Sequence, residues 1–452
     1  MATRRGPNPR RSSNELALPS DGEAGRTKPS RQTPRLKRLA RRDGPPVAPA
    51  RTSVAEQLLI DVLPELDGDR VLCMTQGQAN FALACTARSV TTQVVCQFFD
   101  LHFATEAAKT LGIQTLSWSQ RKNYSPSPLW GEGRGEGRSE RSTAPHPQPL
   151  SPKGRGELVD CVRSLATGPH ANLELRCAAD FVAASEVNSP FDIVALPLSP
   201  TGEAEFVREL LQEGHQALRI GGRMAVAVKN PRDTWIHGEL KKLFAKVTRR
   251  PTQEGVLYLA TKTEPLRKRK NFTCEFAFRD GQQLIQIVSR PGVFSHRELD
   301  GGARALINAM QIRDGMRVLD IGCGSGAVGL AAALRASDVH VVCLDSHTRA
   351  VQCTARGAEM NGIISLKAIL AADGDCGEPG SFDLALGNPP YFSDYRIAEL
   401  FLQSAHRALK PGGTILIVTK NPARFETRMP DLFRDVRIHP AKSYVVVEGT
   451  RG

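Results

Sequence analysis

The sequence lacks several features that would place it in common classes of protein. No apolar run reaches the roughly 18 residues that a membrane span requires, and the first residues contain no apolar segment typical of a secretory signal peptide. The ten cysteines form no C-x-x-C pair, and several fall within apolar, strand-like runs. We therefore expect a cytoplasmic protein with reduced, buried thiols, without a metal site, a disulfide framework or a membrane contact.

Acidic residues are few relative to basic ones, and the imbalance is concentrated at one end of the chain. The formal net charge is +13, and residues 1–53 contain thirteen Lys or Arg against four Asp or Glu. Because this segment is also rich in Pro, Gly and Ser, we expect a disordered basic tail. Such a tail suits the phosphates of a nucleic acid, but a solvated or misassigned start explains it equally well.

A long internal repeat determines the predicted architecture. Residues from Gly68 (GDRVLCM) align with residues from Gly315 (GMRVLDI) at an offset of 247, and two VVC triplets keep the same offset. A second alignment, at an offset of 191, pairs residues from Phe191 with residues from Phe382 and preserves a glycine pair and a Lys-Asn-Pro triplet in each copy. This spacing predicts a tandem duplication of one domain.

Each copy alternates β-rich runs with helical patterns, which predicts an α/β fold with a doubly wound, mostly parallel sheet. We expect two tandem Rossmann-like domains, at residues 54–265 and 266–452, after the tail. A Gly-, Pro- and Ser-rich stretch at about 120–157 is predicted to be a disordered insertion in the first domain. Helices are expected to end at 361–362 and 412–413, and a hairpin to turn at 280–281.

A glycine-rich loop in the second copy is a candidate ligand site. The sequence DIGCGSG follows a predicted strand and precedes a predicted helix, and its glycines would let a ligand approach the helix N-terminus. Asp345 ends the next strand, where a carboxylate would bind ribose hydroxyls, and Asp373 ends the third, where it would contact an adenine amine. Strand-end capping or turn formation is the alternative for both. The candidate cofactor-binding residues are Asp320, Gly322, Gly324, Gly326, Asp345 and Asp373.

The stretch LALGNPPYFSDY, further along the second copy, contains a second candidate site. Proline fixes its own backbone and favours extended geometry in the residue before it, so the chain after this apolar strand must form a stiff elbow. The candidate catalytic residues are Asn388, Pro389, Pro390 and Tyr391.

With both motifs present, residues from about 270 to 452 resemble class I S-adenosylmethionine-dependent methyltransferases. The resemblance implies that S-adenosylmethionine is the cofactor and that an exocyclic amine is methylated. It also implies that Asn388 Oδ1 and the carbonyl of Pro389 accept the two hydrogens of the –NH2 group, and that Pro390 keeps this carbonyl in place. Tyr391 would supply a face on which a flipped-out base stacks.

The lead-in RPGVFSHRELDGGARALI, which starts at Arg290, and the decayed first copy narrow the resemblance. Together they resemble the bacterial ribosomal RNA (guanine-N2) methyltransferases of the small-subunit methyltransferase C type. This implies a monomer that methylates guanine in ribosomal RNA or a ribosomal subunit. Phe294 is expected either to line the cofactor pocket or to pack in the core. A tyrosine at position 391 is more typical of adenine-N6 and release-factor glutamine-N5 methyltransferases, so these remain open, as does a non-enzymatic RNA-binding assembly factor.

The first copy has lost the residues that carry this chemistry. It is therefore predicted to be a degenerate methyltransferase-like domain that binds no cofactor and instead supports the second copy, recognises RNA, or does both. The replacements at the two offsets are Cys73 for Asp320, Thr75 for Gly322, Ala79 for Gly326, Phe98 for Asp345 and Pro197 for Asn388.

Overall fold

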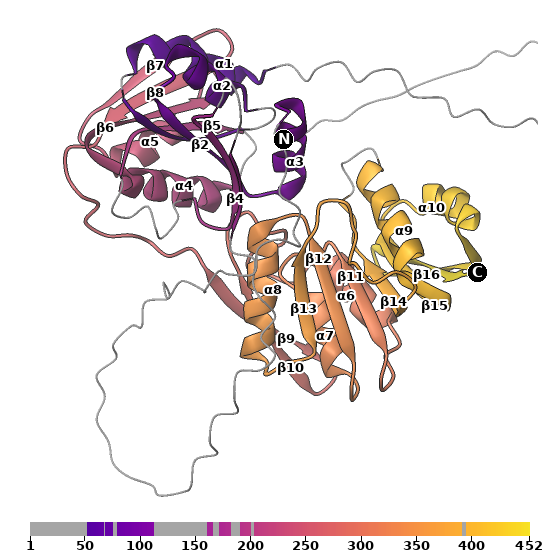
Figure 1. Cartoon of the computed structure of the whole chain (residues 1–452). Helices are drawn as coiled ribbons and strands as arrows, with labels where there is room; N and C mark the ends of the chain where they lie inside the picture. Colours follow the sequence, from indigo (N-terminus) through magenta and orange to yellow (C-terminus); the bar gives the residue numbers. More distant parts are fainter. Residues whose placement is uncertain are drawn as a thin grey trace, which may run out of the picture. The chain divides into compact units, whose positions relative to one another are not determined.

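The computed structural model describes residues 52–66, 68–75, 79–112, 171–181, 190–199, 203–390 and 395–452, and the backbone of 161–165. Nearly all of the predicted tail, the predicted insertion at 120–157 and Tyr391 lie outside the described residues. The part of the chain from 50 onward packs as one unit, in which a sheet covered by helices occurs twice (Figure 1).

The second half contains a seven-stranded sheet with the order β13-β12-β11-β14-β15-β17-β16, in which β17 runs antiparallel to the other six strands. Helices α6, α7 and α8 pack on one face of the sheet, and α9 and α10 on the other. The strands are β11 (Arg317–Ile321), β12 (His340–Asp345), β13 (Leu366–Leu370), β14 (Phe382–Gly387), β15 (Leu409–Thr419), β16 (Phe433–Ala441) and β17 (Tyr444–Arg451). The helices are α6 (Gly301–Ala309), α7 (Ala327–Leu334), α8 (Thr348–Met360), α9 (Arg396–Ala408) and α10 (Ala423–Arg428).

The first half repeats this topology in the order β3-β4-β2-β1-β5-β6-β8-β7, with β3 as an additional edge strand. Helices α1, α2 and α3 pack on one face, and α4 and α5 on the other. The strands are β1 (Arg70–Met74), β2 (Gln93–Phe98), β3 (Cys161–Leu165), β4 (Leu173–Ala178), β5 (Phe191–Leu198), β6 (Leu218–Val228), β7 (Val247–Pro251) and β8 (Val256–Thr261). The helices are α1 (Val54–Val62), α2 (Asn80–Arg88), α3 (Leu101–Thr110), α4 (Ala204–Ala217) and α5 (Trp235–Lys241).

The predicted duplication of an α/β fold is therefore confirmed, and the correspondence extends to single residues. Strands β6 and β15 are both eleven residues long, begin 191 residues apart and have the same pattern of buried and exposed positions. Helices α1 and α6 begin and end 247 residues apart. Both offsets are the ones that the sequence repeat predicted.

A hairpin of β9 (Cys274–Asp280) and β10 (Gln283–Ser289) precedes the second sheet. Its turn contains Gly281 at φ +59°, as the sequence predicted. Helix α8 also ends as expected, because Gly362 follows its C-cap at φ +68°.

The predicted helix end at 412–413 is wrong. Helix α9 ends at Ala408, and β15 already begins at Leu409, whose backbone is extended (φ −66°, ψ 142°). Pro411 explains the difference, because a proline cannot donate the helical hydrogen bond and disfavours helical geometry in the residue before it.

The side chains of nine cysteines are described; eight of these are buried, and none of the nine forms a disulfide. No helix in this part of the chain has both the length and the apolar character that a membrane span requires.

Candidate functional site

The glycine-rich loop connects β11 to α7 and needs its glycines for two physical reasons. Gly322, Gly324 and Gly326 all have positive φ, at +70°, +57° and +84°, a region that residues with a Cβ rarely adopt. A Cβ on Gly322 would also come within 2.4 Å of the Phe401 ring, and one on Gly326 within 2.8 Å of Thr354 Oγ1. A Cβ on Gly324 would meet nothing nearer than 3.9 Å, so the loop faces open space there.

Asp320 lies at the start of this loop but turns its carboxylate into the protein. Its Oδ2 accepts a hydrogen bond of 2.9 Å from the backbone N–H of Gly329, in the first turn of α7. Burial raises the pKa of Asp320 to about 7. This contact holds α7 against β11; a direct contact of Asp320 with a cofactor remains a prediction.

Asp345 ends β12 and lies against the same loop. Its Oδ2 accepts a hydrogen bond of 2.9 Å from the N–H of Gly324, and its Oδ1 one of 2.8 Å from the N–H of His347. Asp345 as a whole is half-buried, and the loss of hydration raises the pKa of its carboxyl group to about 6. The structure therefore places Asp345, the residue predicted to bind ribose, in contact with the glycine loop.

Asp373 does not end the third strand, because β13 stops at Leu370. The side chain is exposed, and its Oδ1 accepts a hydrogen bond of 3.1 Å from the N–H of Asp375. A side chain that bonds its own backbone two residues on forms a local turn, which competes with continuation of a strand. These contacts fit the turn-forming alternative, and a role of Asp373 in adenine binding stays a prediction.

The Asn-Pro-Pro elbow directly follows β14, next to β11 in the sheet. Asn388 is half-buried, and its Nδ2 donates a hydrogen bond of 2.8 Å to Oδ2 of Asp300. Pro389 is buried and Pro390 half-buried. A Cβ on Gly302 would lie only 2.8 Å from Asn388 Oδ1, so this glycine makes room for the amide.

Asp300 is a site residue that motif analysis of the sequence did not identify. It is the N-cap of α6, and the oxygen that Asn388 contacts also accepts a hydrogen bond of 2.9 Å from the N–H of Ala303. The repeat held a usable signal, because Asp300 corresponds at the offset of 247 to Ser53, the N-cap of α1. A carboxylate thus replaces a hydroxyl at this cap in the half that retains the motifs.

The lead-in loop before α6 passes close to the glycine loop. Phe294 is 57% exposed, so the expectation that it packs in the core is wrong, and its backbone oxygen is the atom nearest to a Cβ on Gly324. Residues at the start of α4 in the first half hold this loop in place. Glu203 accepts a hydrogen bond of 2.7 Å from the N–H of Gly292, and Arg297 forms two hydrogen bonds with Glu205.

In the first half, side chains fill the corresponding loop. Glu56 of α1 is 1% exposed, and its Oε1 accepts a hydrogen bond of 2.8 Å from Thr75 Oγ1, at the position of Gly322. Burial raises the pKa of this glutamate. Ala79 keeps the left-handed backbone (φ +59°) of Gly326 and, like it, is the N-cap of the following helix. The described end of the loop at Ala79 thus keeps the backbone conformation of Gly326, while a polar side chain stands at the position of Gly322.

The two halves meet through equivalent positions of the repeat. Asp100, just after β2, pairs in an antiparallel bridge with His347, which lies 247 residues later, just after β12. The flanking hydrogen bonds are equivalent too, because the N–H of Leu101 donates to the carbonyl of Ser346 and the N–H of Thr348 to that of Phe99, both at 2.8 Å. This contact places residues just after β2 of the first half beside His347, two residues after Asp345 at the end of β12.

A buried ion cluster reinforces the contact between the halves. Arg349 of α8 is fully buried, forms an ion pair of 2.5 Å with Glu209 of α4 and donates a hydrogen bond of 2.8 Å to the carbonyl of Ala179. Arg290 is also buried and pairs with Asp180 at 2.8 Å. The second half therefore places two of its guanidinium groups among carboxylates of the first half.

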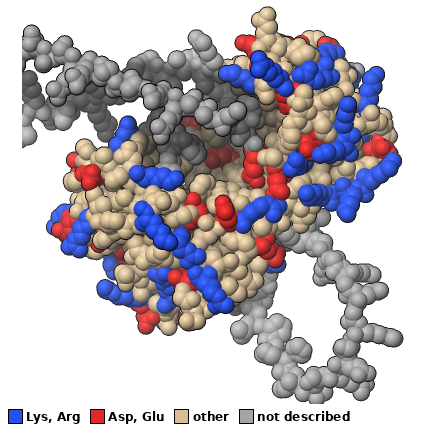
Figure 2. Space-filling view, turned by 180° about the vertical axis from the view of Figure 1, so that it is seen from behind, with Lys and Arg blue, Asp and Glu red and all other residues tan. Residues whose placement is uncertain are grey.

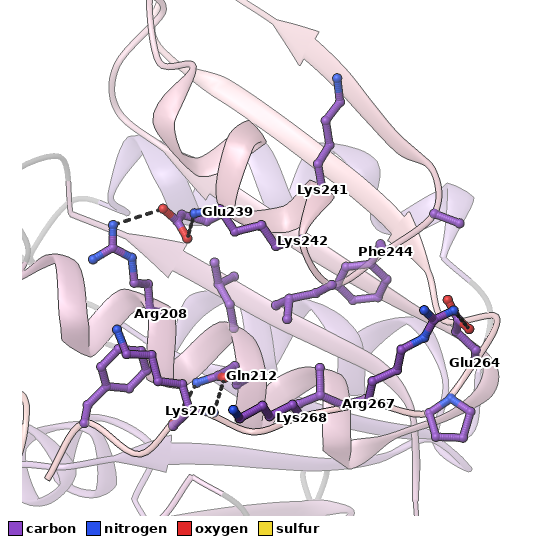
Figure 3. Close-up of a pocket in the computed structure, with 16 residues that line it drawn as sticks. Arg208, Gln212, Glu239, Lys241, Lys242, Phe244, Glu264, Arg267, Lys268 and Lys270 are labelled. Carbon is purple, nitrogen blue, oxygen red and sulfur yellow. Dashed lines mark hydrogen bonds and ion pairs between the residues drawn. The ribbon is translucent and has the colours of Figure 1, made fainter.

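A basic groove lies on the first half, lined by α4, α5 and the segment 264–272 (Figure 3). The cavity measures about 770 Å³, and six cationic side chains outnumber two carboxylates along it. Within the described residues, Glu239 pairs with Arg208 and Lys242. The cationic residues are Arg208, Lys241, Lys242, Arg267, Lys268 and Lys270.

Comparison with known proteins finds similarity in the second half of the chain. Residues 284–448 match the family described as "Methyltransferase small domain". The ribosomal RNA small subunit methyltransferase C of Pseudomonas aeruginosa (strain LESB58) is 36% identical over 146 residues, which cover 31% of this chain and 43% of that protein. The protein of the same name from Pseudomonas entomophila (strain L48) is 31% identical over 183 residues, which cover 39% and 54%. The aligned region thus spans about half the length of these curated relatives.

A solved structure has the same fold across both halves. It is described as T. thermophilus 16S rRNA N2 methyltransferase in complex with AdoMet and guanosine, and it superposes with a TM-score of 0.65 at 20% identity, covering 88% of this chain and 92% of that chain. The arrangement of two tandem methyltransferase-like domains is therefore shared with this protein. Residues 284–448 thus match the methyltransferase small domain family, and the second half of the chain has the class I methyltransferase fold and is similar to bacterial ribosomal RNA small subunit methyltransferase C.

Proposed function

We propose that this protein transfers a methyl group from S-adenosylmethionine to N2 of a guanine in ribosomal RNA. The names of the relatives suggest the reaction, and the hydrogen bond from Asn388 Nδ2 to Asp300 carries the proposal. This bond orients the amide with Nδ2 toward Asp300, and the amide oxygen Oδ1, which is an acceptor, would accept a hydrogen of the substrate amine. Acting on ribosomal RNA, the protein would work in the cytoplasm.

The glycine loop and Asp345 would hold the cofactor. The open space at Gly324 lets an adenosyl group approach the N-terminus of α7, and the carboxylate at the end of β12 would accept hydrogen bonds from ribose hydroxyls. Bound S-adenosylmethionine would supply an electrophilic methyl group on a sulfonium. The lead-in loop with Phe294 lies beside this space and would border the cofactor.

The Asn-Pro-Pro elbow would orient the nucleophile. An exocyclic amine on a heteroaromatic ring is a poor nucleophile, because its lone pair is delocalised into the ring. Two fixed acceptors, Asn388 Oδ1 and the carbonyl of Pro389, would hold both hydrogens so that the lone pair points at the methyl carbon. Orientation of this kind offsets on the order of 7 to 11 kcal/mol of a barrier at best, and no base is needed before the methyl transfer.

The basic groove of the first half would contact the RNA backbone. The six cationic side chains that line this cavity of about 770 Å³ suit phosphate groups, which release counterions when they are neutralised. Lys and Arg side chains are numerous on the face of the molecule that Figure 2 shows. We infer that the first half supports the second and also holds the ribosomal RNA or ribosomal subunit that serves as substrate.

Nucleoside mass spectrometry tests the reaction. Ribosomal RNA from a deletion strain is expected to lose one N2-methylguanine, which a plasmid copy of the wild-type protein restores and an Asn388→Ala copy does not. Mapping the lost modification identifies the nucleotide. Unchanged ribosomal RNA together with an unmethylated release-factor glutamine would overturn the proposal in favour of protein methylation.

A further inference from the structure

The carboxylate of Asp300 has more hydrogen-bonding capacity than its structural contacts use. Both protein donors, the N–H of Ala303 and Nδ2 of Asn388, bond to the same oxygen, Oδ2. Within the described residues, the other oxygen, Oδ1, accepts no hydrogen bond, although a carboxylate offers about four acceptor sites in total. Asp300 is only half-buried, so this oxygen is available to a ligand beside Asn388.

The first half shows that capping the helix does not require a carboxylate. Ser53, at the position of Asp300, caps α1 through a hydrogen bond of 3.2 Å from the N–H of Glu56 to its Oγ. The position of Asn388 is occupied there by Pro197. The half without the amide therefore also lacks the carboxylate, while the helix begins at the same place in both.

The two side chains offer a pair of acceptors, and guanine is the base that offers a matching pair of donors. On its Watson–Crick edge the N1–H and the N2 amine are neighbours. Adenine and cytosine instead place a ring nitrogen lone pair beside the amine, and a glutamine side chain places a carbonyl oxygen there. An ionised carboxylate would attract the N1–H of guanine and repel those lone pairs.

We propose that Asp300 is a specificity residue that selects guanine, with Oδ1 accepting the N1–H while Asn388 Oδ1 accepts a hydrogen of the N2 amine. The inference rests on the proposed methyl transfer and names the group that chooses its base. A site built to hydrogen-bond a substrate donor rejects analogues that lack it, because the buried acceptor is then left unpaired.

The test compares guanine with 2-aminopurine, which has the same 2-amino group but no N1–H. The substrate is a ribosomal RNA fragment carrying either base at the nucleotide mapped in the deletion strain, and transfer of labelled methyl from S-adenosylmethionine is measured. Wild-type protein is expected to prefer guanine by about 10- to 100-fold, the worth of one hydrogen bond to a charged group. In Asp300→Asn this preference is expected to shrink to about threefold or less, mainly through slower transfer to guanine.

Asparagine is also a good N-cap, so the variant keeps α6, and calorimetry is expected to show unchanged cofactor affinity. Glu298→Gln is the matched control, since Glu298 is exposed, lies two residues earlier and has no side-chain hydrogen bond within the described residues; its base preference should equal that of wild type. If Asp300→Asn slows both substrates equally and keeps the ratio, the carboxylate only orients Asn388 and the specificity proposal is overturned. A wild-type protein that methylates neither substrate would instead refute the proposed reaction.

Discussion

The two halves of this chain have one fold and differ in what stands at equivalent positions. Around the ligand loop, Glu56 and Thr75 bond to each other where the second half has Ala303 and Gly322. Pro197, within β5, stands where the second half has Asn388, just after β14. Because the strand order and the length of β6 and β15 survive these changes, the fold does not depend on the motif residues. The motif residues of the second half are therefore not needed for the strand order, although the glycines are needed for the conformation of their own loop.

The largest effect on stability is expected at the ion cluster between the halves. Arg349→Met is expected to destabilise the full chain by about 3–5 kcal/mol, because the buried Glu209 loses its nearer guanidinium partner and keeps Arg290 at 3.6 Å. Urea denaturation followed by circular dichroism measures the loss. Arg356→Met is the control, since it removes an exposed ion pair with Glu359 on the same helix, which is worth at most about 0.5 kcal/mol. Equal losses in the two variants would show that the cluster does not hold the halves together.

The next largest effect is expected at the elbow. Asn388→Ala removes one acceptor of the amine and should lower methyl transfer about 100-fold or more, by analogy with the loss of one preorganised hydrogen bond in other enzymes. Cofactor affinity, measured by calorimetry, should stay nearly the same. Pro197→Ala at the matching place of the first half should leave transfer unchanged. Weakened cofactor binding with normal transfer in Asn388→Ala would contradict the role of this amide.

Exchanging the residues at the helix N-caps after the two loops sharpens the comparison. Ala79→Gly should stabilise the protein by about 1 kcal/mol, because alanine is strained at its positive φ. Gly326→Ala should destabilise it by more than Ala79→Gly stabilises it, since the new Cβ meets Thr354 at 2.8 Å in addition to the strain. Thermal unfolding of both variants measures the effects. A stabilising Gly326→Ala would show that the loop geometry is not as described.

Asp345, the carboxylate predicted to bind ribose, should make the affinity of the second half for S-adenosylmethionine depend on pH. Folding raises the pKa of Asp345 to about 6, so its proton stabilises the cofactor-free protein, and this contribution is lost as the pH rises through about 6. Ribose hydroxyls donate to the ionised form, so affinity for S-adenosylmethionine should rise about tenfold per pH unit below 6 and level off above it. Calorimetric titrations between pH 5 and 8 measure this. Asp345→Asn should weaken binding at pH 7.5 and flatten the profile; an unchanged slope would assign it to another group, such as Asp320.

The smallest effect is expected in the basic groove of the first half. Lys268→Gln and Lys270→Gln should each weaken RNA binding a few-fold and reduce the steepness of its salt dependence by about one ion. Filter binding of ribosomal RNA at several salt concentrations measures both quantities. Lys442→Gln, on an exposed turn of the second half, is the control. If the groove variants and the control behave alike, the groove is not the RNA surface.

The sequence predicted those parts of the fold and the site that depend on local chemistry. The glycine loop, the Asn-Pro-Pro elbow and the two repeat offsets were each visible as short patterns, because backbone geometry there demands particular residue types. The contact between Asp300 and Asn388 joins residues 88 positions apart, and no short pattern announces it. The end of β13 at Leu370 was missed because a local turn at Asp373 overrode an apolar run.

The bridge between Asp100 and His347 has a consequence for how the halves came to differ. Equivalent positions that meet one another form the kind of interface seen in two-fold symmetric dimers. In a dimer of identical chains, any substitution at one site is imposed on both. When one chain contains both copies, equivalent positions can differ, as Glu56 and its counterpart Ala303 do. Joining the two copies in one chain therefore allows each copy to change independently, so that one copy can lose the ligand-site residues while the other keeps them.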